Sequence, residues 1–325
     1  MKKIMTLCTA LLVLLTGCSQ QSSGTFPEDN IQMVIPYGPG GGFDTTVRVF
    51  APFFAKHLGG GITVLPENIP GTGGRRGTAT VFRAKPDGYT LGIFNLPGLV
   101  LPSVLGEKID YELREMSWIG RVESQDYVLL VQAGSPINTL QDLQAQEKIT
   151  FVSIGYGTTV LAAIQVMAEQ MGLMEKNPTF LTGYEGTTDQ LVALVRGDGN
   201  ATLSPVSTAM QYIQSGNLKA LAVTGTARSK HLPDVATFTE LGYPDLAPLN
   251  VQRSIAGPPG MDPALLSQLR SAFDKAMTDP EFIAAATKAQ MDVAPLNGDQ
   301  AAAAIIENFT YYEKFKANLS NPNQQ

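Results

Sequence analysis

The stretch that decides the fold is Pro36-Tyr-Gly-Pro-Gly-Gly-Gly-Phe-Asp44, which joins an apolar run at 31–35 to an amphipathic run at about 44–58. Its glycines permit backbone conformations with positive φ, so several N–H groups can turn toward one point. The helix that follows adds unpaired N–H groups and a partial positive charge. This order predicts a backbone site for an anion, with Asp44 as the helix N-cap that accepts from the N–H of Thr46 or Val47.

Two interpretations of this loop fit its local sequence equally well: an anion site, or a tight turn before a capped helix with no ligand. Nucleotide motifs do not fit it. A Walker loop needs a lysine and the dinucleotide pattern needs a glycine at the position where this chain has Phe43. No cofactor is therefore expected.

Short runs with β propensity alternate with amphipathic runs in the rest of the chain, as in α/β proteins. We expect strands at 31–35, 62–65, 89–94, 118–122, 127–132, 149–154, 179–181, 201–203, 218–224 and 251–256. We expect helices at 44–58, 77–83, 158–171, 187–196, 263–277, 280–288 and 299–318. The run at 251–256 is interpreted as a return to the first unit, which predicts two α/β lobes joined by two strands, with a cleft between them.

The N-terminus has the features of an export signal. Lys2 and Lys3 precede an apolar run at 4–15 that is short for a membrane span, and Leu15-Thr16-Gly17-Cys18 matches a lipobox. We expect a signal peptide at 1–17, lipid on Cys18 and a polar tether at 18–27. The alternative is an ordinary secretory signal in which Cys18 is incidental. The expected location is a cell or outer membrane, facing the periplasm or the exterior.

The remaining residues are expected to form lobe 1 from 28–124 and 253–325, and lobe 2 from 125–252. The whole chain has 325 residues and a formal net charge of −6, which disfavours nucleic-acid binding because that needs a concentrated basic face. Of the two cysteines, Cys8 lies in the leader and Cys18 takes the lipid, so the mature chain has no thiol for a disulfide, metal or nucleophile. A monomer is expected.

Loops in the second lobe resemble the first loop in composition. Ser153-Ile-Gly-Tyr-Gly-Thr-Thr159 follows a strand and precedes a helix that Thr158 or Thr159 can cap, and segments 183–187 and 204–207 have a similar setting. Each loop alone is a weak indication, but several at strand ends favour a cleft. Arg75 and Arg76 could grip a carboxylate, although a solvated pair on a helix is favoured.

Catalytic patterns are largely missing from the sequence. His57 and His231 are isolated, and no Gly-x-Ser-x-Gly, His-Glu-x-x-His or Cys/His cluster occurs. No carboxylate-dense loop suggests a metal site. We therefore expect a binding protein rather than an enzyme.

Several motifs together resemble the receptors of tripartite tricarboxylate transporters, also known as Bordetella-uptake-type binding proteins. The resemblance extends from about Ile31 to Phe309. It rests on the loop at 36–44, Glu67-Asn-Ile-Pro-Gly-Thr-Gly-Gly74, Lys85-Pro-Asp-Gly-Tyr-Thr-Leu91, Leu221-Ala-Val-Thr224, Leu232-Pro-Asp-Val-Ala-Thr-Phe238 and Glu240-Leu-Gly-Tyr-Pro244.

The resemblance implies a bilobed, type II periplasmic-binding-protein-like α/β fold that closes on its ligand and delivers it to membrane transporter subunits. It also implies that loops at 36–46 and 153–159 hold a ligand carboxylate. Two departures from the family pattern disfavour a highly charged ligand: Glu185 replaces a lysine, and Val160 and Leu161 stand where a histidine is usual. A monocarboxylate, a slender dicarboxylate or an amide is favoured instead.

The expected function is capture of a small organic acid by an exported lipoprotein, without cofactor or metal. Alternatives are a receptor that presents the ligand to a sensor kinase, which a neighbouring kinase gene would favour, and an exported hydrolase or isomerase, which turnover of the acid would favour. The expected binding residues are Tyr37, Gly40, Gly41, Gly42, Phe43, Asp44, Thr45, Phe94, Gly155, Tyr156, Gly157, Thr158, Thr159, Gly186 and Ser204.

Overall fold

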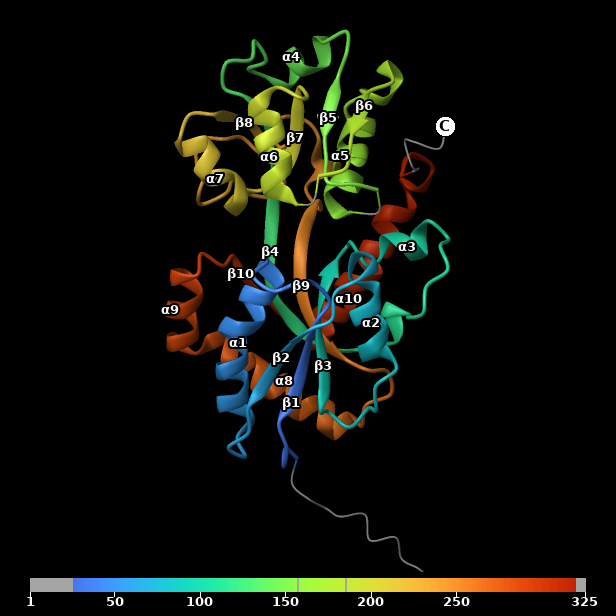
Figure 1. Cartoon of the computed structure of the whole chain (residues 1–325), viewed down its shortest axis with the longest axis vertical. Helices are drawn as coiled ribbons and strands as arrows, with labels where there is room; N and C mark the ends of the chain where they lie inside the picture. Colours follow the sequence, from blue (N-terminus) through green and yellow to red (C-terminus); the bar gives the residue numbers. More distant parts are fainter. Residues whose placement is uncertain (1–25, 157, 185, 320–325) are drawn as a thin grey trace, which may run out of the picture.

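In the computed structural model, which describes residues 26–156, 158–184 and 186–319, two α/β lobes are joined by a pair of long strands (Figure 1). Those two strands are β4 (Ser117–Gln132) and β9 (Asn250–Gly257). Lobe 1 also contains the strands β1 (Ile31–Ile35), β2 (Val64–Asn68), β3 (Thr90–Leu96) and β10 (Val293–Asn297). Lobe 2 contains the strands β5 (Thr150–Val152), β6 (Thr179–Leu181), β7 (Ala201–Pro205) and β8 (Leu218–Val223).

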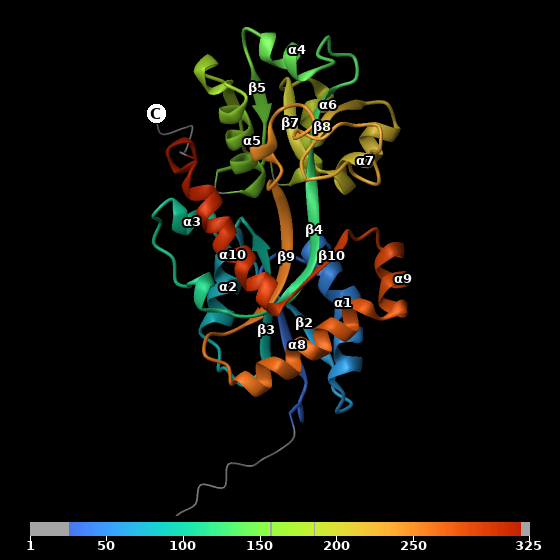
Figure 2. The same ribbon diagram turned by 180° about the vertical axis from the view of Figure 1, so that it is seen from behind.

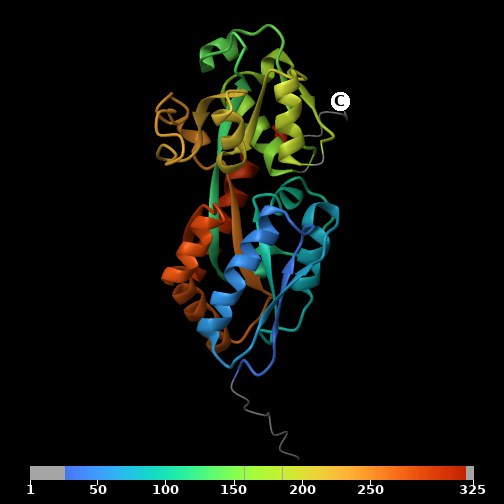
Figure 3. The ribbon, with the colours of Figure 1, turned by 60° about the vertical axis from the view of Figure 1, so that its left-hand side comes forward.

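The strands form one sheet that passes through both lobes in the order β2-β1-β3-β9-β4-β7-β5-β6, with β8 and β10 also paired to β4. In lobe 1, β1 is parallel to β2 and β3, whereas β9 is antiparallel to β3 and β4. β4 pairs with β9 as far as Asp126 and with β7 and β8 from Tyr127 onward. Figure 3 shows β4 in green and β9 in orange running between the lobes.

The helices cover the two faces of this sheet. The helices of lobe 1 are α1 (Gly42–Leu58), α2 (Arg75–Phe82), α3 (Leu101–Val104), α8 (Pro263–Thr278), α9 (Pro280–Lys288) and α10 (Gly298–Glu313). Those of lobe 2 are α4 (Leu140–Ala145), α5 (Thr159–Gln170), α6 (Thr187–Arg196) and α7 (Val206–Gln214). Within the described parts of the chain, no helix combines the length and apolar character that crossing a bilayer requires.

Local sequence explains where several helices begin. Asp262 and Asp279 cap α8 and α9 through their carboxylates, and each is followed by a proline at the first helical position. Proline is tolerated there because its missing N–H is not needed. Thr139 with Asp142 forms a capping box at α4, and Asn297 with Gln300 forms one at α10. These caps fix the starts of helices that the apolar pattern alone leaves uncertain by a few residues.

A third connection links the lobes, in addition to the two strands that the sequence predicted. In Figure 2, α10, drawn in red, runs from lobe 1 up to lobe 2. The hydroxyl of Tyr311 donates to the backbone carbonyl of Asp245 in lobe 2 at 2.7 Å. Tyr312 and Phe315 belong to the same buried cluster as Phe151 of lobe 2. The apolar core is therefore continuous between the lobes behind α10.

Packing of lobe 1 predicts a large effect of one small substitution. A methyl group on Gly120, in β4, would lie 2.2 Å from a ring carbon of Phe273, which is fully buried in α8. We expect Gly120→Ala to lower the free energy of unfolding by about 1–3 kcal/mol because the ring has no room to move. Gly134→Ala, where the new methyl meets no atom within 4 Å, is the control. Urea unfolding measures both variants. If Gly120→Ala and Gly134→Ala each had the same free energy of unfolding as the parent, the steric account would be wrong.

Candidate functional site

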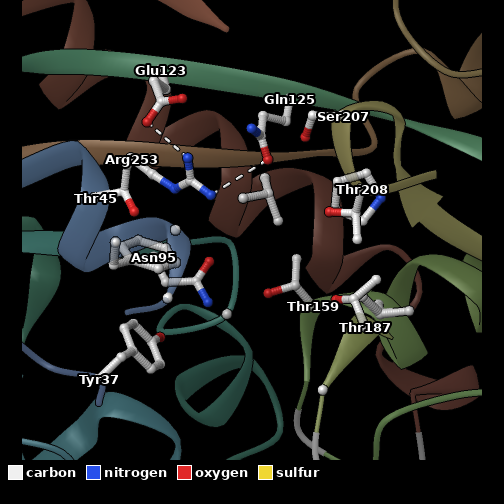
Figure 4. A pocket seen from close by; sticks show the side chains of 18 of the residues that line it. Tyr37, Thr45, Asn95, Glu123, Gln125, Thr159, Thr187, Ser207, Thr208 and Arg253 are labelled. Carbon is white, nitrogen blue, oxygen red and sulfur yellow. Dashed lines mark hydrogen bonds and ion pairs between the residues drawn. The ribbon is translucent and has the colours of Figure 1, made fainter. Parts of the chain in front are cut away.

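A cavity of about 620 Å³ lies between the lobes and is called here the front cavity (Figure 4). Lobe 1 contributes the loop before α1, the end of β3 and the loop after α9, while lobe 2 contributes the starts of α5, α6 and α7. Its lining residues are Tyr37, Gly41, Gly42, Phe43, Thr45, Gly73, Asn95, Gly98, Glu123, Gln125, Ile154, Thr158, Thr159, Val160, Gly186, Thr187, Pro205, Ser207, Thr208, Val251, Arg253, Ala289, Gln290 and Met291.

Four helices begin at this cavity. Gly41 and Gly186 are the N-cap positions of α1 and α6, Thr158 is that of α5, and Pro205 is that of α7. The Thr158 side chain accepts from the N–H of Leu161, which confirms its expected capping role. Helix N-termini present free N–H groups and partial positive charge, so their convergence suits an anionic group. Both lobes thus direct helix starts toward one cavity.

A buried ion pair forms another wall of the front cavity. Arg253 on β9 faces Glu123 directly across the β4–β9 ladder, and its Nη1 donates to Glu123 Oε2 at 2.7 Å. Glu123 is fully buried and Arg253 is 9% exposed. Glu123 also accepts from the backbone N–H of Asp292 at 3.2 Å and contacts the Thr46 hydroxyl. The guanidinium therefore has a fixed position, which Figure 4 shows beside Gln125.

Arg253 also approaches the glycine loop closely. A methyl group on Gly42 would lie 2.4 Å from Arg253 Nη2, and the guanidinium carbon lies 5.0 Å from the centre of the Phe43 ring. Its Nε has no hydrogen-bond partner among the described residues. The sequence interpretation placed a carboxylate site here without a cationic side chain. The structure corrects it, because a guanidinium lies against the start of α1.

Tyr37, Asn95 and Thr159 form a polar seam near the meeting point of the lobes. The hydroxyl of Tyr37 donates to the carbonyl of Gly73 at 3.4 Å, and the Tyr37 and Phe43 rings pack at 4.6 Å. Burial raises the pKa of Tyr37, and a hydrogen bond from Asn95 opposes the rise. Thr159 Oγ1, from lobe 2, and Asn95 Oδ1, from lobe 1, are buried without partners among the described residues.

The structure brings many of the sequence-predicted residues together at the cavity and separates others from it. Those that line it are Tyr37, Gly41, Gly42, Phe43, Thr45, Thr158, Thr159 and Gly186. Those that do not are Gly40, Asp44, Phe94, Gly155, Tyr156 and Ser204. Gly157, Glu185 and the predicted lipidation site Cys18 lie outside the described residues.

Asp44 has a different role from the one expected. It is the third residue of α1 rather than the N-cap, which is Gly41. Its carboxylate accepts from the backbone N–H of Gly40 at 3.0 Å, from Asn68 and from Arg48. The Arg48 hydrogen bond above all holds its pKa at about 2. Asp44 therefore fixes the glycine loop from behind and does not face the ligand space.

Other departures follow from burial. Phe94 is 1% exposed and packs edge-to-face on Trp118 in the core, and Ser204 is fully buried in β7, where its hydroxyl donates to the Pro205 carbonyl. Tyr156, by contrast, is 40% exposed and lies outside the lining. Phe94 and Ser204 were chosen near the ends of strands, but alternation along a strand directs every second side chain into the core, whereas Tyr156 lies in the loop after β5.

The remaining sequence candidates are also placed by the structure. Arg75 pairs with Glu107 at 2.7 Å and Arg76 is exposed, so neither lines the front cavity. His57 lies in the last turn of α1, whose first turn lines the front cavity, and its Nε2 contacts Asp279 Oδ2 at 2.8 Å. In the described part of the chain, no group of three or more His, Cys, Asp and Glu side chains is arranged to hold a metal ion.

A second cavity, of about 1030 Å³, lies on the other side of β4 and β9 and is called here the back cavity. Successive side chains along a strand point to opposite faces of the sheet. The side chains that line the front cavity are therefore Glu123, Gln125 and Arg253, and those that line the back cavity are Ser124, Asp126 and Gln252. A bulge between Arg121 and Glu123 places Arg121 on the back as well. The back cavity is larger, but the helix starts and the buried guanidinium favour the front cavity as the ligand site.

The back cavity contains a carboxyl group with an unusual pKa. Burial, and then the nearby Asp292, raise the pKa of Asp126 to about 6, while Arg121 opposes the rise. The unfolded chain ionises Asp126 at its ordinary pKa of about 4, so the folded state is penalised at pH values above about 6. We expect Asp126→Asn to raise the free energy of unfolding by about 1–2 kcal/mol at pH 8, a figure reduced for partial exposure.

This gain in stability should fade as the pH falls from about 6 to about 4, where the parent also becomes protonated at this position. Chemical unfolding at pH 8 and pH 4 measures it. Asp234→Asn, at an exposed site in lobe 2, is the control. If Asp126→Asn were no more stable than the parent at pH 8, the raised pKa of Asp126 would be contradicted.

Comparison with known proteins agrees with the fold. A family model described as "Tripartite tricarboxylate transporter family receptor" matches residues 46–316. A Cupriavidus necator protein, "UPF0065 protein in gbd 5'region", is 31% identical over 301 residues, covering 90% of this chain and 88% of that protein. "Protein BugT" of Bordetella pertussis is 29% identical and covers 81% of each chain.

Solved structures show the same architecture. The periplasmic binding protein BugD superposes with a TM-score of 0.73 at 26% identity, covering 90% of this chain and 98% of that chain. MatC of Rhodopseudomonas palustris, solved with bound malate, superposes with a TM-score of 0.73 at 22% identity, covering 91% of this chain and all of that chain. The second likeness shows the fold alone. The bilobed type II binding-protein fold is thus confirmed, and the chain belongs to the tripartite tricarboxylate transporter receptor family, whose members are solute-binding receptors and not enzymes.

Proposed function

We propose that this receptor captures a small organic carboxylate in the front cavity and delivers it to membrane transporter subunits. The observation that carries the proposal is the convergence of four helix starts and Arg253 on one cavity between the lobes. A buried carboxylate needs hydrogen bonds to replace its lost water, and free N–H groups at helix starts supply them. The structures solved with malate and with adipate share the fold and are consistent with this ligand class.

The proposal includes lobe movement about β4 and β9, with residues 28–124 and 253–325 in one lobe and 125–252 in the other. Gly98 of lobe 1 and Thr159 of lobe 2 are adjacent, since a methyl group on Gly98 would lie 2.7 Å from Thr159 Oγ1. Both residues line the front cavity. A bound ligand and the contact between Gly98 and Thr159 would therefore stabilise the same closed form of the two lobes.

We further propose that Cys18 is lipidated and that the receptor acts as a monomer at a membrane surface. The lipobox at 15–18 supports the anchor. Membrane fractionation of cells that express the full chain tests it: Cys18→Ser should move the protein from the membrane to the soluble fraction. Retention of the variant in the membrane fraction would count against lipid anchoring.

The ligand proposal is tested by thermal-shift screening of the mature protein against organic acids, sugars and metal cations, followed by calorimetry of the acids that stabilise it. Stabilisation by one or more small carboxylates is expected, because only the closed, folded state binds them. Stabilisation by sugars or cations with no response to any carboxylate would refute the proposal.

A further inference from the structure

We propose that Glu123 makes the front cavity selective for monoanions, so that the ligand carries one carboxylate and, at its other end, an uncharged hydrogen-bond donor such as an amide or hydroxyl. This inference rests on the proposed function and specifies its ligand class. It follows from the charges and the unpartnered polar atoms that the described lining residues present.

The described side chains that line the cavity carry no net charge. Among the described lining residues, Glu123 and Arg253 are the charged ones, and they pair with each other at 2.7 Å. Glu123 is fully buried, so its charge is poorly screened by solvent. A ligand carboxylate that approaches Arg253 therefore meets the negative charge of Glu123 close behind the guanidinium. Arg253 is already paired with Glu123, so it cannot supply a full compensating charge to the ligand.

Positive potential must then come from the helix starts. Each helix N-terminus is equivalent to about half a positive charge. The first turns of α1 and α6 already contain Asp44 and Asp189, whereas those of α5 and α7 contain no acidic residue. The two uncompensated helix starts provide roughly one positive charge in total. That amount suits one carboxylate and leaves a second without compensation.

The polar seam indicates what the other end of the ligand requires. Asn95 Oδ1 is buried without a partner among the described residues, and the Asn95 side chain and Thr159 Oγ1 both lie beside Gly98. A buried acceptor needs a donor, and an ionised carboxylate has none to offer. An amide N–H or a hydroxyl does. Thr159 Oγ1, 5% exposed and also without a partner among the described residues, can exchange a hydrogen bond with the same group.

The test compares three ligands at each of several chain lengths: a dicarboxylate, its monoamide and its monomethyl ester, measured by calorimetry on the mature protein. The monoamide is expected to bind about tenfold or more tightly than the dicarboxylate, equivalent to about 1.4 kcal/mol. The ester, which is a monoanion without a donor, should fall between them. Tighter binding of the dicarboxylate than of the monoamide at every length would overturn the inference.

Variants identify the residue responsible. Glu123→Gln adds one net positive charge to the front cavity and should reduce the monoamide preference to near equality. Asp126→Asn makes the same charge change three residues away on the back of β4, so it should leave the preference unchanged. Equal shifts in both variants would show a long-range charge effect and overturn the role of Glu123.

The ligand comparison in the parent protein remains decisive if Glu123→Gln does not fold. Failure of the proposed function has a different signature, because then none of the three ligand types would bind at any length.

Discussion

Replacing Arg253 with methionine is expected to lower the free energy of unfolding by about 3–5 kcal/mol, because it leaves the carboxylate of Glu123 buried without its counter-ion. Glu123 has no exposed surface through which water could compensate, and its remaining contacts are the Asp292 N–H and the Thr46 hydroxyl. Methionine keeps much of the aliphatic volume of arginine, so loss of packing contributes little. Urea unfolding at neutral pH, with the midpoint and slope both fitted, measures the change.

A double-mutant cycle separates the charge effect from the cavity effect. The variant Arg253→Met with Glu123→Gln should recover part of the lost stability, since no unpaired charge remains buried. Arg121→Met is the comparison variant, because Arg121 lies on the back of β4, the strand that carries Glu123. Its side chain donates to the Ala294 carbonyl rather than to a carboxylate. Purely additive losses in the cycle would contradict the ion-pair account.

Gly42→Ala is expected to weaken ligand binding by about 1–3 kcal/mol, or roughly 5- to 150-fold in Kd. The new methyl group would lie 2.4 Å from Arg253 Nη2, and the guanidinium cannot retreat easily because Glu123 holds it. Either Arg253 or the start of α1 must move, and both belong to the proposed anion site. The free energy of unfolding should fall as well, because the buried Arg253–Glu123 pair must shift to admit the methyl group, so binding is compared at a temperature where both proteins are folded. Calorimetry with the best ligand from the screen measures the loss.

Gly41→Ala is the matched control for this prediction. Gly41 also lines the front cavity, but a methyl group there would meet only the Gly38 carbonyl oxygen, at 3.8 Å. Its φ of −82° is open to alanine. If both variants bound ligand equally, the approach of Arg253 to the glycine loop would have no part in recognition.

The sequence predicts the fold well because its patterns reflect local physical constraints. The strands at 31–35 and 179–181 and the helices at 187–196 and 280–288 have the expected bounds. The helices α3 and α4 and the strand β10 were not predicted, since each has six residues or fewer, and α7 was missed although its nine residues are amphipathic.

The main error in the site comes from the segment 123–126. Its sequence Glu-Ser-Gln-Asp interrupts two apolar runs, so it was predicted to separate strands, whereas β4 continues through it. Polar residues occur there because both faces of the strand line cavities. The charged Arg253, within a run otherwise typical of a buried strand, is the indication that could have pointed to a buried ionic partner.

The glycine loops, by contrast, were located correctly relative to helix starts, since strand, loop and helix are consecutive in sequence. Which side chains face inward could not be derived, because that depends on the bulge before Glu123 and on packing between distant segments. Phe94 and Tyr156 illustrate the two outcomes: one is buried in the core and the other is exposed to solvent.

The sharing of β4 and β9 by two cavities limits how this receptor can diverge. Inserting or deleting one residue in either strand would reverse its faces and send Glu123 or Arg253 to the opposite compartment, exchanging them with Asp126 or Gln252. Descendants can therefore acquire new ligand preferences along these strands only through point replacements that preserve strand length. Surface loops, free of that constraint, can accept changes in length.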